Sequence, residues 1–68
     1  MIKIIEYRGK HRLVLTRVLN QFVQQNPNSD LNITPDNFIL KRKSWIRLTL
    51  TGNEFDVKSL IRSIENAL

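Results

Sequence analysis

The sequence has no cysteine, and its 68 residues include only two glycines, two prolines and one histidine. Without cysteine there can be no disulfide, no thiolate metal site and no thiol nucleophile. Two isolated glycines cannot form a glycine-rich phosphate-binding loop. No run approaches the ~18 apolar residues that a membrane-spanning helix needs. Stability therefore rests on one small core, because a chain of this length buries only roughly 60% of its unfolded surface.

Catalytic and targeting signals are equally sparse. His11 lies in a basic run, and no motif places an acid and a nucleophile beside it. The six Asp and Glu residues have neither EF-hand nor HExxH spacing. The stretch MIKIIEYRGK lacks the apolar segment of a signal peptide. We therefore expect a single domain over residues 1–68 that is cytoplasmic, is not an enzyme, holds no metal or cofactor and does not contact a membrane.

What the sequence does contain is positive charge, with eleven Lys and Arg against six Asp and Glu and a net charge of +5. Residues 1–17 hold five cations and one acid, and residues 38–53 hold four cations and no acid. Two separated positive clusters suggest an anionic partner. The same net charge is also ordinary for a soluble small domain, so both interpretations stay open at this point.

Apolar periodicity predicts the first two elements. Residues 2–7 are rich in β-branched and aromatic side chains and predict a strand. An amphipathic helix is then predicted from about His11 to Gln25, before the Asn26-Pro27 stop. Its apolar stripe is Leu15, Val18, Leu19, Phe22 and Val23. An alternative makes Arg8-Gly9-Lys10 a hairpin turn and residues 11–16 a second strand.

A β-hairpin is predicted over residues 37–51. Ile46, Leu48 and Leu50 alternate with polar residues, which is the period of a strand buried on one face. The link Arg42-Lys43-Ser44 lacks the Asn-Gly of the tightest turns, so we expect a loop of three to five residues. The preceding residues 31–36, which include Pro35, are expected to form a connector.

The last predicted element is a helix over residues 54–68. Asn53 is a good N-cap, and Asp56 at the third helical position resembles a capping box. Glu54 can pair with Lys58 one turn later. The expected core stripe of this helix is Val57, Leu60, Ile61, Ile64 and Leu68.

The element order is therefore β-α-β-β-α. The simplest packing places both helices on one face of a three-stranded sheet, an α/β fold of the α+β type. Strand alternation divides the side chains between two faces. The helix-covered face is expected to receive Ile2, Ile4, Phe38, Leu40, Ile46, Leu48 and Leu50. The open face is expected to present Lys3, Ile5, Tyr7, Ile39, Lys41, Trp45, Arg47 and Thr49.

Such an open face, mixing aromatic and cationic side chains, is typical of surfaces that bind single-stranded nucleic acid, DNA or RNA. Cations at a helix N-terminus conflict with the helix dipole, and a bound phosphate would resolve that conflict. A helix that begins at Leu13 or later would instead leave them in a solvated loop. The hypothesised nucleic-acid-binding residues are Lys41, Arg42, Lys43, Trp45, Arg47 and Tyr7, with Lys10 and Arg12 as auxiliary phosphate contacts.

A rival hypothesis is a small regulatory protein-interaction domain whose open face, with Ile5, Ile39 and Trp45, pairs with a second copy or a partner protein. A third possibility is that the strand faces are reversed and Trp45 is a core residue. The element order resembles that of the DNA-damage-inducible protein I family, small regulators that act on a recombinase filament, but their acidic last helix is absent. The segment from Thr51-Gly52 into the last helix resembles small ferredoxin-like ligand-sensing domains. Both resemblances rest on element order, so no residue roles are transferred.

Overall fold

The computed structural model describes residues 1–68 and contains one three-stranded sheet. Its strands are β1 (Ile2–Arg8), β2 (Asn32–Leu40) and β3 (Lys43–Thr51). The spatial order is β1-β3-β2, and both pairings are antiparallel. The strand that comes last in the sequence, β3, is thus the central one, and β1 and β2 are the two edge strands.

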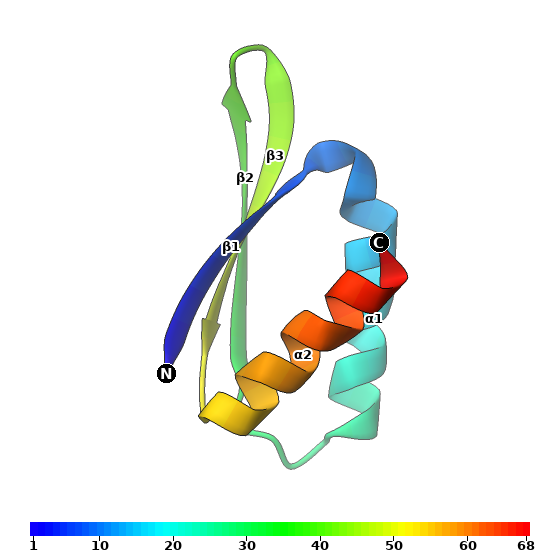
Figure 1. Ribbon diagram of the computed structural model, residues 1–68, viewed down its shortest axis with the longest axis vertical. Helices are drawn as coiled ribbons and strands as arrows, with labels where there is room; N and C mark the ends of the chain where they lie inside the picture. The colour runs from blue at the N-terminus through cyan, green and yellow to red at the C-terminus, as the bar shows by residue number, and fades with distance from the viewer.

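Two helices cover one face of this sheet (Figure 1). A 3₁₀ turn, η1 (Gly9–His11), leads from β1 into α1 (Arg12–Gln25), and α2 (Glu54–Ala67) follows β3. The predicted β-α-β-β-α order and the α+β fold are confirmed. The alternative second strand over residues 11–16 is wrong, because that segment is helical.

The core lies between β3 and the two helices. It consists of nine buried residues: Leu15, Val18, Phe22, Ile46, Leu48, Leu50, Val57, Leu60 and Ile64. Burying each of these side chains contributes about 1.5–3 kcal/mol. The predicted stripes of both helices and of β3 account for this core. Two residues expected in it are largely exposed, Val23 at 58% and Leu68 at 49%, since each lies in the last turn of its helix or beyond it.

Cross-strand pairing corrects the predicted faces of the two edge strands. Directly opposed residues share a face, and Leu48 opposes Ile5 on one side and Pro35 on the other. The prediction was right for β3 and wrong for β1 and β2. On the helix-covered face are Lys3, Ile5, Tyr7, Ile33, Pro35, Asn37 and Ile39. On the open face are Ile2, Ile4, Glu6, Arg8, Phe38, Leu40, Trp45, Arg47 and Thr49. The predicted faces of β1 and β2 are therefore exchanged, which is the effect that a shift of one residue in strand register has on every side chain.

Strand β2 begins earlier than predicted and includes Pro35. The expected connector over residues 31–36 is therefore wrong, because residues 32–36 pair with β3. Proline is tolerated there because β2 is an edge strand, where a missing N–H can face solvent.

The start of α2 is as predicted. The Asp56 backbone N–H donates to Asn53 Oδ1 at 2.8 Å, and Asn53 Nδ2 donates to Asp56 Oδ2 at 2.8 Å. Lys58 Nζ lies 2.6 Å from Glu54 Oε1. The hydrogen bond from Lys58 and its positive charge lower the pKa of Glu54.

Candidate nucleic-acid interface

The β2–β3 hairpin extends beyond the helices (Figure 1). Its turn is basic in sequence, with Lys41, Arg42 and Lys43 in succession. Leu40 pairs with Lys43, so the loop is only Lys41 and Arg42, shorter than the predicted three to five residues. Both loop residues are left-handed, with φ of 52° and 64°. Two residues with positive φ are the signature of a type I′ turn, normally Asn-Gly. Here two cations take those positions, and the left-handed backbone costs about 1–2 kcal/mol for each of them.

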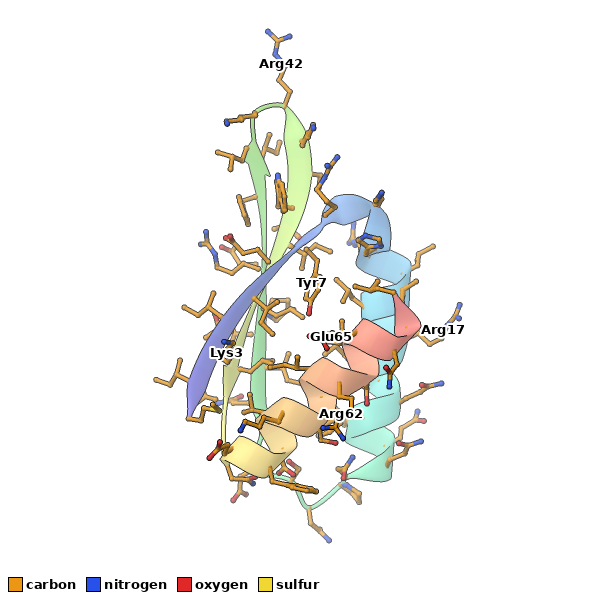
Figure 2. All side chains as sticks on the ribbon, in the orientation of Figure 1. Lys3, Tyr7, Arg17, Arg42, Arg62 and Glu65 are labelled. Atoms are coloured by element: carbon orange, nitrogen blue, oxygen red, sulfur yellow. The ribbon has the colours of Figure 1, made fainter.

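These turn cations are accessible to an external partner. Lys41, Arg42 and Lys43 are exposed, and Figure 2 shows the Arg42 side chain pointing away from the rest of the molecule. None of the three makes an ion pair; of the eleven cationic side chains, only Arg47 and Lys58 do. No acidic residue lies between Asn37 and Asn53 to neutralise them.

A close contact brings the first basic cluster to the base of this hairpin. A Cβ placed on Gly9 would lie 2.5 Å from Ser44 Oγ and 2.8 Å from Ser44 Cβ. Only glycine therefore allows η1 to approach β3 at this point. Arg8 opposes Trp45 across the sheet, and its guanidinium carbon lies 5.4 Å from the ring centroid. The two clusters, far apart in the sequence, thus meet at one end of the molecule.

An arginine already lies over each of the two aromatic rings of the open face. Phe38 and Trp45 stack with centroids 6.4 Å apart and an interplanar angle of 15°. Arg8 covers Trp45, and Arg47 lies 4.7 Å from the Phe38 centroid. Such cation–π contacts occur within about 6 Å. The predicted open-face position of Trp45 is confirmed, but its ring is not a bare stacking platform.

Arg47 is on the open face as predicted, but its charge is already balanced. Its guanidinium contacts Glu6 Oε2 at 2.9 Å and Asp36 Oδ2 at 4.0 Å. Those acids flank it on the two neighbouring strands. Arg47 is therefore less available to a phosphate than the turn cations are.

Tyr7 does not lie on the open face, so its predicted placement beside Trp45 is wrong. It points from β1 toward Glu65 of α2 (Figure 2). Burial, and secondarily the Glu65 carboxylate, raises the pKa of the Tyr7 phenol. The hydroxyl is thus held between layers rather than presented to a ligand.

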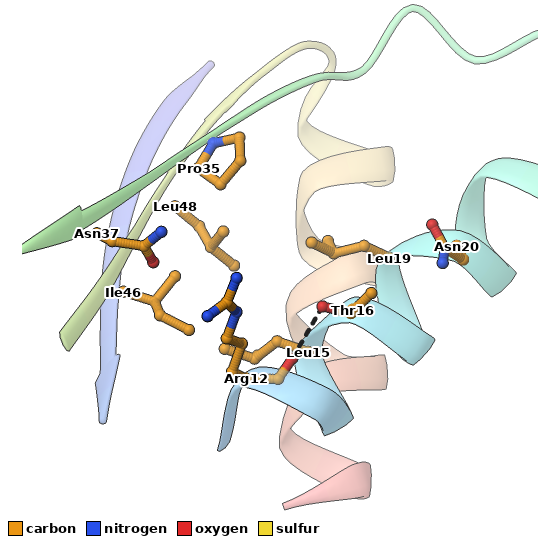
Figure 3. Close-up of a pocket in the computed structure, with 9 residues that line it drawn as sticks. All are labelled: Arg12, Leu15, Thr16, Leu19, Asn20, Pro35, Asn37, Ile46 and Leu48. Carbon is orange, nitrogen blue, oxygen red and sulfur yellow. Dashed lines mark hydrogen bonds between the residues drawn. The ribbon is translucent and has the colours of Figure 1, made fainter. Parts of the chain in front are cut away.

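Lys10 and Arg12, the two auxiliary residues, are separated by the helix start. Lys10 is exposed in η1, the turn that contacts Ser44. The α-helix begins at Arg12, between the two helix starts considered from the sequence, His11 and Leu13. No side chain caps it at His11. Arg12 reaches over a groove of about 300 Å³ (Figure 3). The groove is lined by Arg12, Leu15, Thr16, Leu19, Asn20, Pro35, Asn37, Ile46 and Leu48.

The candidate interface differs from the predicted one at four residues. Arg8 and Phe38 join it, whereas Tyr7 and Arg12 leave it, because Tyr7 lies on the helix-covered face and Arg12 lines the groove beside Leu15 and Ile46. Arg8 was visible in the sequence as part of the first basic cluster, but its contact with Trp45 depends on the β1–β3 register. Phe38 was assigned to the wrong face for the same reason.

Comparisons with known proteins identify no relative. A scan against protein-family models matched no family, and searches of curated proteins and of solved structures found no match either. Neither helix has the length and apolar character required to cross a membrane. Nowhere do three or more His, Asp or Glu side chains gather where they could hold a metal ion.

Proposed function

We propose that this chain is a non-enzymatic nucleic-acid-binding module that contacts phosphates with the basic end of the molecule. The observation that supports this most strongly is the Gly9–Ser44 contact, which adds a second basic segment to the hairpin. The phosphate-contacting residues of this basic end are Arg8, Lys10, Lys41, Arg42 and Lys43.

The geometry of the basic end favours phosphate contacts over base stacking. The rings of Phe38 and Trp45 each lie against an arginine, whereas the turn cations are exposed and unpaired. A two-stranded ribbon also has the dimensions to enter the major groove of a duplex. We therefore expect duplexes to bind at least as tightly as single strands.

Local strain at this end also supports a functional role. The turn holds two cations at positive φ, and Trp45 Nε1 is buried without an acceptor. An unpaired buried donor costs about 1–3 kcal/mol. Such departures from local preference persist where function requires them.

The test is fluorescence anisotropy with labelled single-stranded and duplex DNA and RNA, repeated between ~50 and ~200 mM salt. Engagement of five cations predicts a slope of about −4 to −5 for log affinity against log salt on a duplex. Emission of Trp45, the only tryptophan, should change if Arg8 leaves its ring for a phosphate.

A matched pair of variants separates the basic end from net charge. Arg42→Glu with Lys43→Glu should reduce the slope by about 2 and weaken binding strongly. Arg17→Glu with Arg62→Glu changes the net charge equally but alters two exposed cations on the helices (Figure 2). This control should bind nearly as well as the wild type. Equal losses in both variants, or no binding at the lower salt, would refute the proposal.

A second candidate function is protein interaction through the open sheet face. Ile2 and Ile4 are 70% and 58% exposed there, and the charge of Arg47 is balanced by Glu6 and Asp36. A protein partner would be lost on Ile4→Lys and retained in the Arg42→Glu, Lys43→Glu variant. Nucleic-acid binding should show the opposite pattern, so the two functions are distinguishable with the same proteins.

A further inference from the structure

The free edge of β1 presents unpaired backbone groups. The Met1 ammonium donates to Gly52 O at 2.8 Å, and Gly52 N donates to Met1 O at 3.1 Å. In an antiparallel ladder, alternate residues bond to the same neighbour. Every second residue after Met1 therefore forms its backbone hydrogen bonds with β3. The backbone N–H and C=O groups of the residues between them point away from the sheet. The outward N–H and C=O groups of β1 belong to Ile2, Ile4, Glu6 and Arg8.

The opposite edge is interrupted by a proline. Because Leu48 bonds to β1, its neighbours Arg47 and Thr49 bond to β2. Pro35 opposes Leu48, so the N–H that it lacks would have pointed outward from the sheet. Proline on an edge is a common device against strand pairing between molecules. Strand β1 has no proline, so its edge is the open one.

The β1 edge is complementary to itself. When two copies pair antiparallel about a twofold axis at Ile5, all seven residues of β1 find a partner. Ile2 then opposes Arg8 of the second copy, and Ile4 opposes Glu6, so outward groups meet outward groups. This register alone uses the whole strand, and it satisfies every free backbone group derived above. A twofold interface of this kind is the commonest form of self-association.

The same register brings opposite charges together. Lys3 lies on the helix-covered face, is exposed and has no ion pair. In the twofold arrangement it opposes Tyr7 of the second copy, whose side chain points toward Glu65 (Figure 2). Glu65 also has no ion pair within its own chain. Lys3 and Tyr7 of one chain are about 13 Å apart along the strand, so only the second copy's Lys3 can approach Glu65.

We propose that β1 is the interface of a twofold dimer in which two three-stranded sheets join into one of six strands, with Lys3 of each copy paired to Glu65 of the other. Because β1 strands run in opposite directions, the two basic ends lie at opposite ends of the joined sheet. The dimer therefore keeps the positive clusters apart, and it forms whether or not nucleic acid is bound.

The first test measures mass by light scattering and sedimentation over about a hundredfold range of protein concentration. The wild type should approach twice the 8.0 kDa chain mass. Ile4→Pro removes an outward N–H that β3 does not use. The variant should therefore stay folded, as judged by circular dichroism, and have the mass of a monomer. Asn37→Pro, its counterpart on the β2 edge, should remain a dimer. A wild type that stays monomeric, or a dimer that tolerates Ile4→Pro, overturns the proposal.

A charge exchange tests the register independently of proline. Lys3→Glu and Glu65→Lys should each weaken dimerisation by at least about tenfold. The double variant, Lys3→Glu with Glu65→Lys, should restore it, because each copy again meets an opposite charge. Both positions are exposed, so folding should be retained. Failure of the double variant to recover would exclude this arrangement.

Discussion

Replacing Gly9 by alanine tests the contact that assembles the basic end. The added Cβ would stand 2.5 Å from Ser44 Oγ, 2.8 Å from Ser44 Cβ and 3.1 Å from Ser44 O. Two of these separations are too short for any stable contact, so η1 or β3 must move. Gly9 does not have a positive φ, so its requirement is space rather than backbone conformation.

The expected cost follows from two opposing effects. Overpacking of a tight contact destabilises by about 1–3 kcal/mol. Alanine also restricts the unfolded chain, which offsets roughly 0.4–1 kcal/mol. Gly9→Ala should therefore lower the free energy of unfolding by about 1–2 kcal/mol, a large fraction for a domain with so small a core.

The assay is urea unfolding followed by the emission of Trp45, the residue next to Ser44. Ser44→Gly removes both clashing side-chain atoms and costs about 0.5–1 kcal/mol alone, as glycine does in a strand. In a double-mutant cycle, Ser44→Gly should recover most of the loss caused by Gly9→Ala. The urea dependence should stay unchanged if only stability is altered.

Two results would refute this reasoning. One is a Gly9→Ala protein as stable as the wild type, which would mean that η1 does not approach β3 as described. The other is strict additivity in the cycle, which would place the cost elsewhere than at Ser44. If the contact is correct, Gly9→Ala should also weaken nucleic-acid binding, because it displaces Arg8 and Lys10 from the hairpin.

Three further predictions concern the turn, the cap and the partly buried Tyr7 phenol. Lys41→Asn with Arg42→Gly suits the left-handed turn and should raise the free energy of unfolding by about 1–3 kcal/mol in urea titrations, whereas a decrease would contradict a type I′ turn. Asn53→Ala should lower the free energy of unfolding by about 1 kcal/mol, which thermal unfolding followed by circular dichroism at 222 nm should show as a melting temperature a few degrees lower; no change would mean that the cap contributes nothing. Tyr7 should ionise in the folded protein above the ordinary value of about 10, read by ultraviolet absorbance. Because the unfolded phenol ionises first, the stability that Tyr7 contributes should be fully present below about pH 10 and be lost as pH rises through the folded pKa; Glu65→Gln should lower that pKa, and an unchanged value would remove Glu65 as a cause.

The sequence alone determined the elements whose signals are local. The helical stripe of α2 and the Asn53–Asp56 cap follow from a period of 3.6 residues and from capping chemistry. Strand β3 was equally clear, since Ile46, Leu48 and Leu50 alternate with polar residues. The basic clusters were visible as composition. Each of these signals lies within one element and needs no distant partner.

Only the tertiary structure decided how those elements face one another. Strand β1 is apolar on both sides, with Ile2 and Ile4 on one and Ile5 and Tyr7 on the other, so alternation could not choose its buried face. The choice came from pairing with β3, in which a shift of one residue exchanges all side chains. That pairing also placed Arg8 on Trp45 and removed Tyr7 from the interface. Strand register depends on contacts between residues some forty positions apart, which no local pattern encodes.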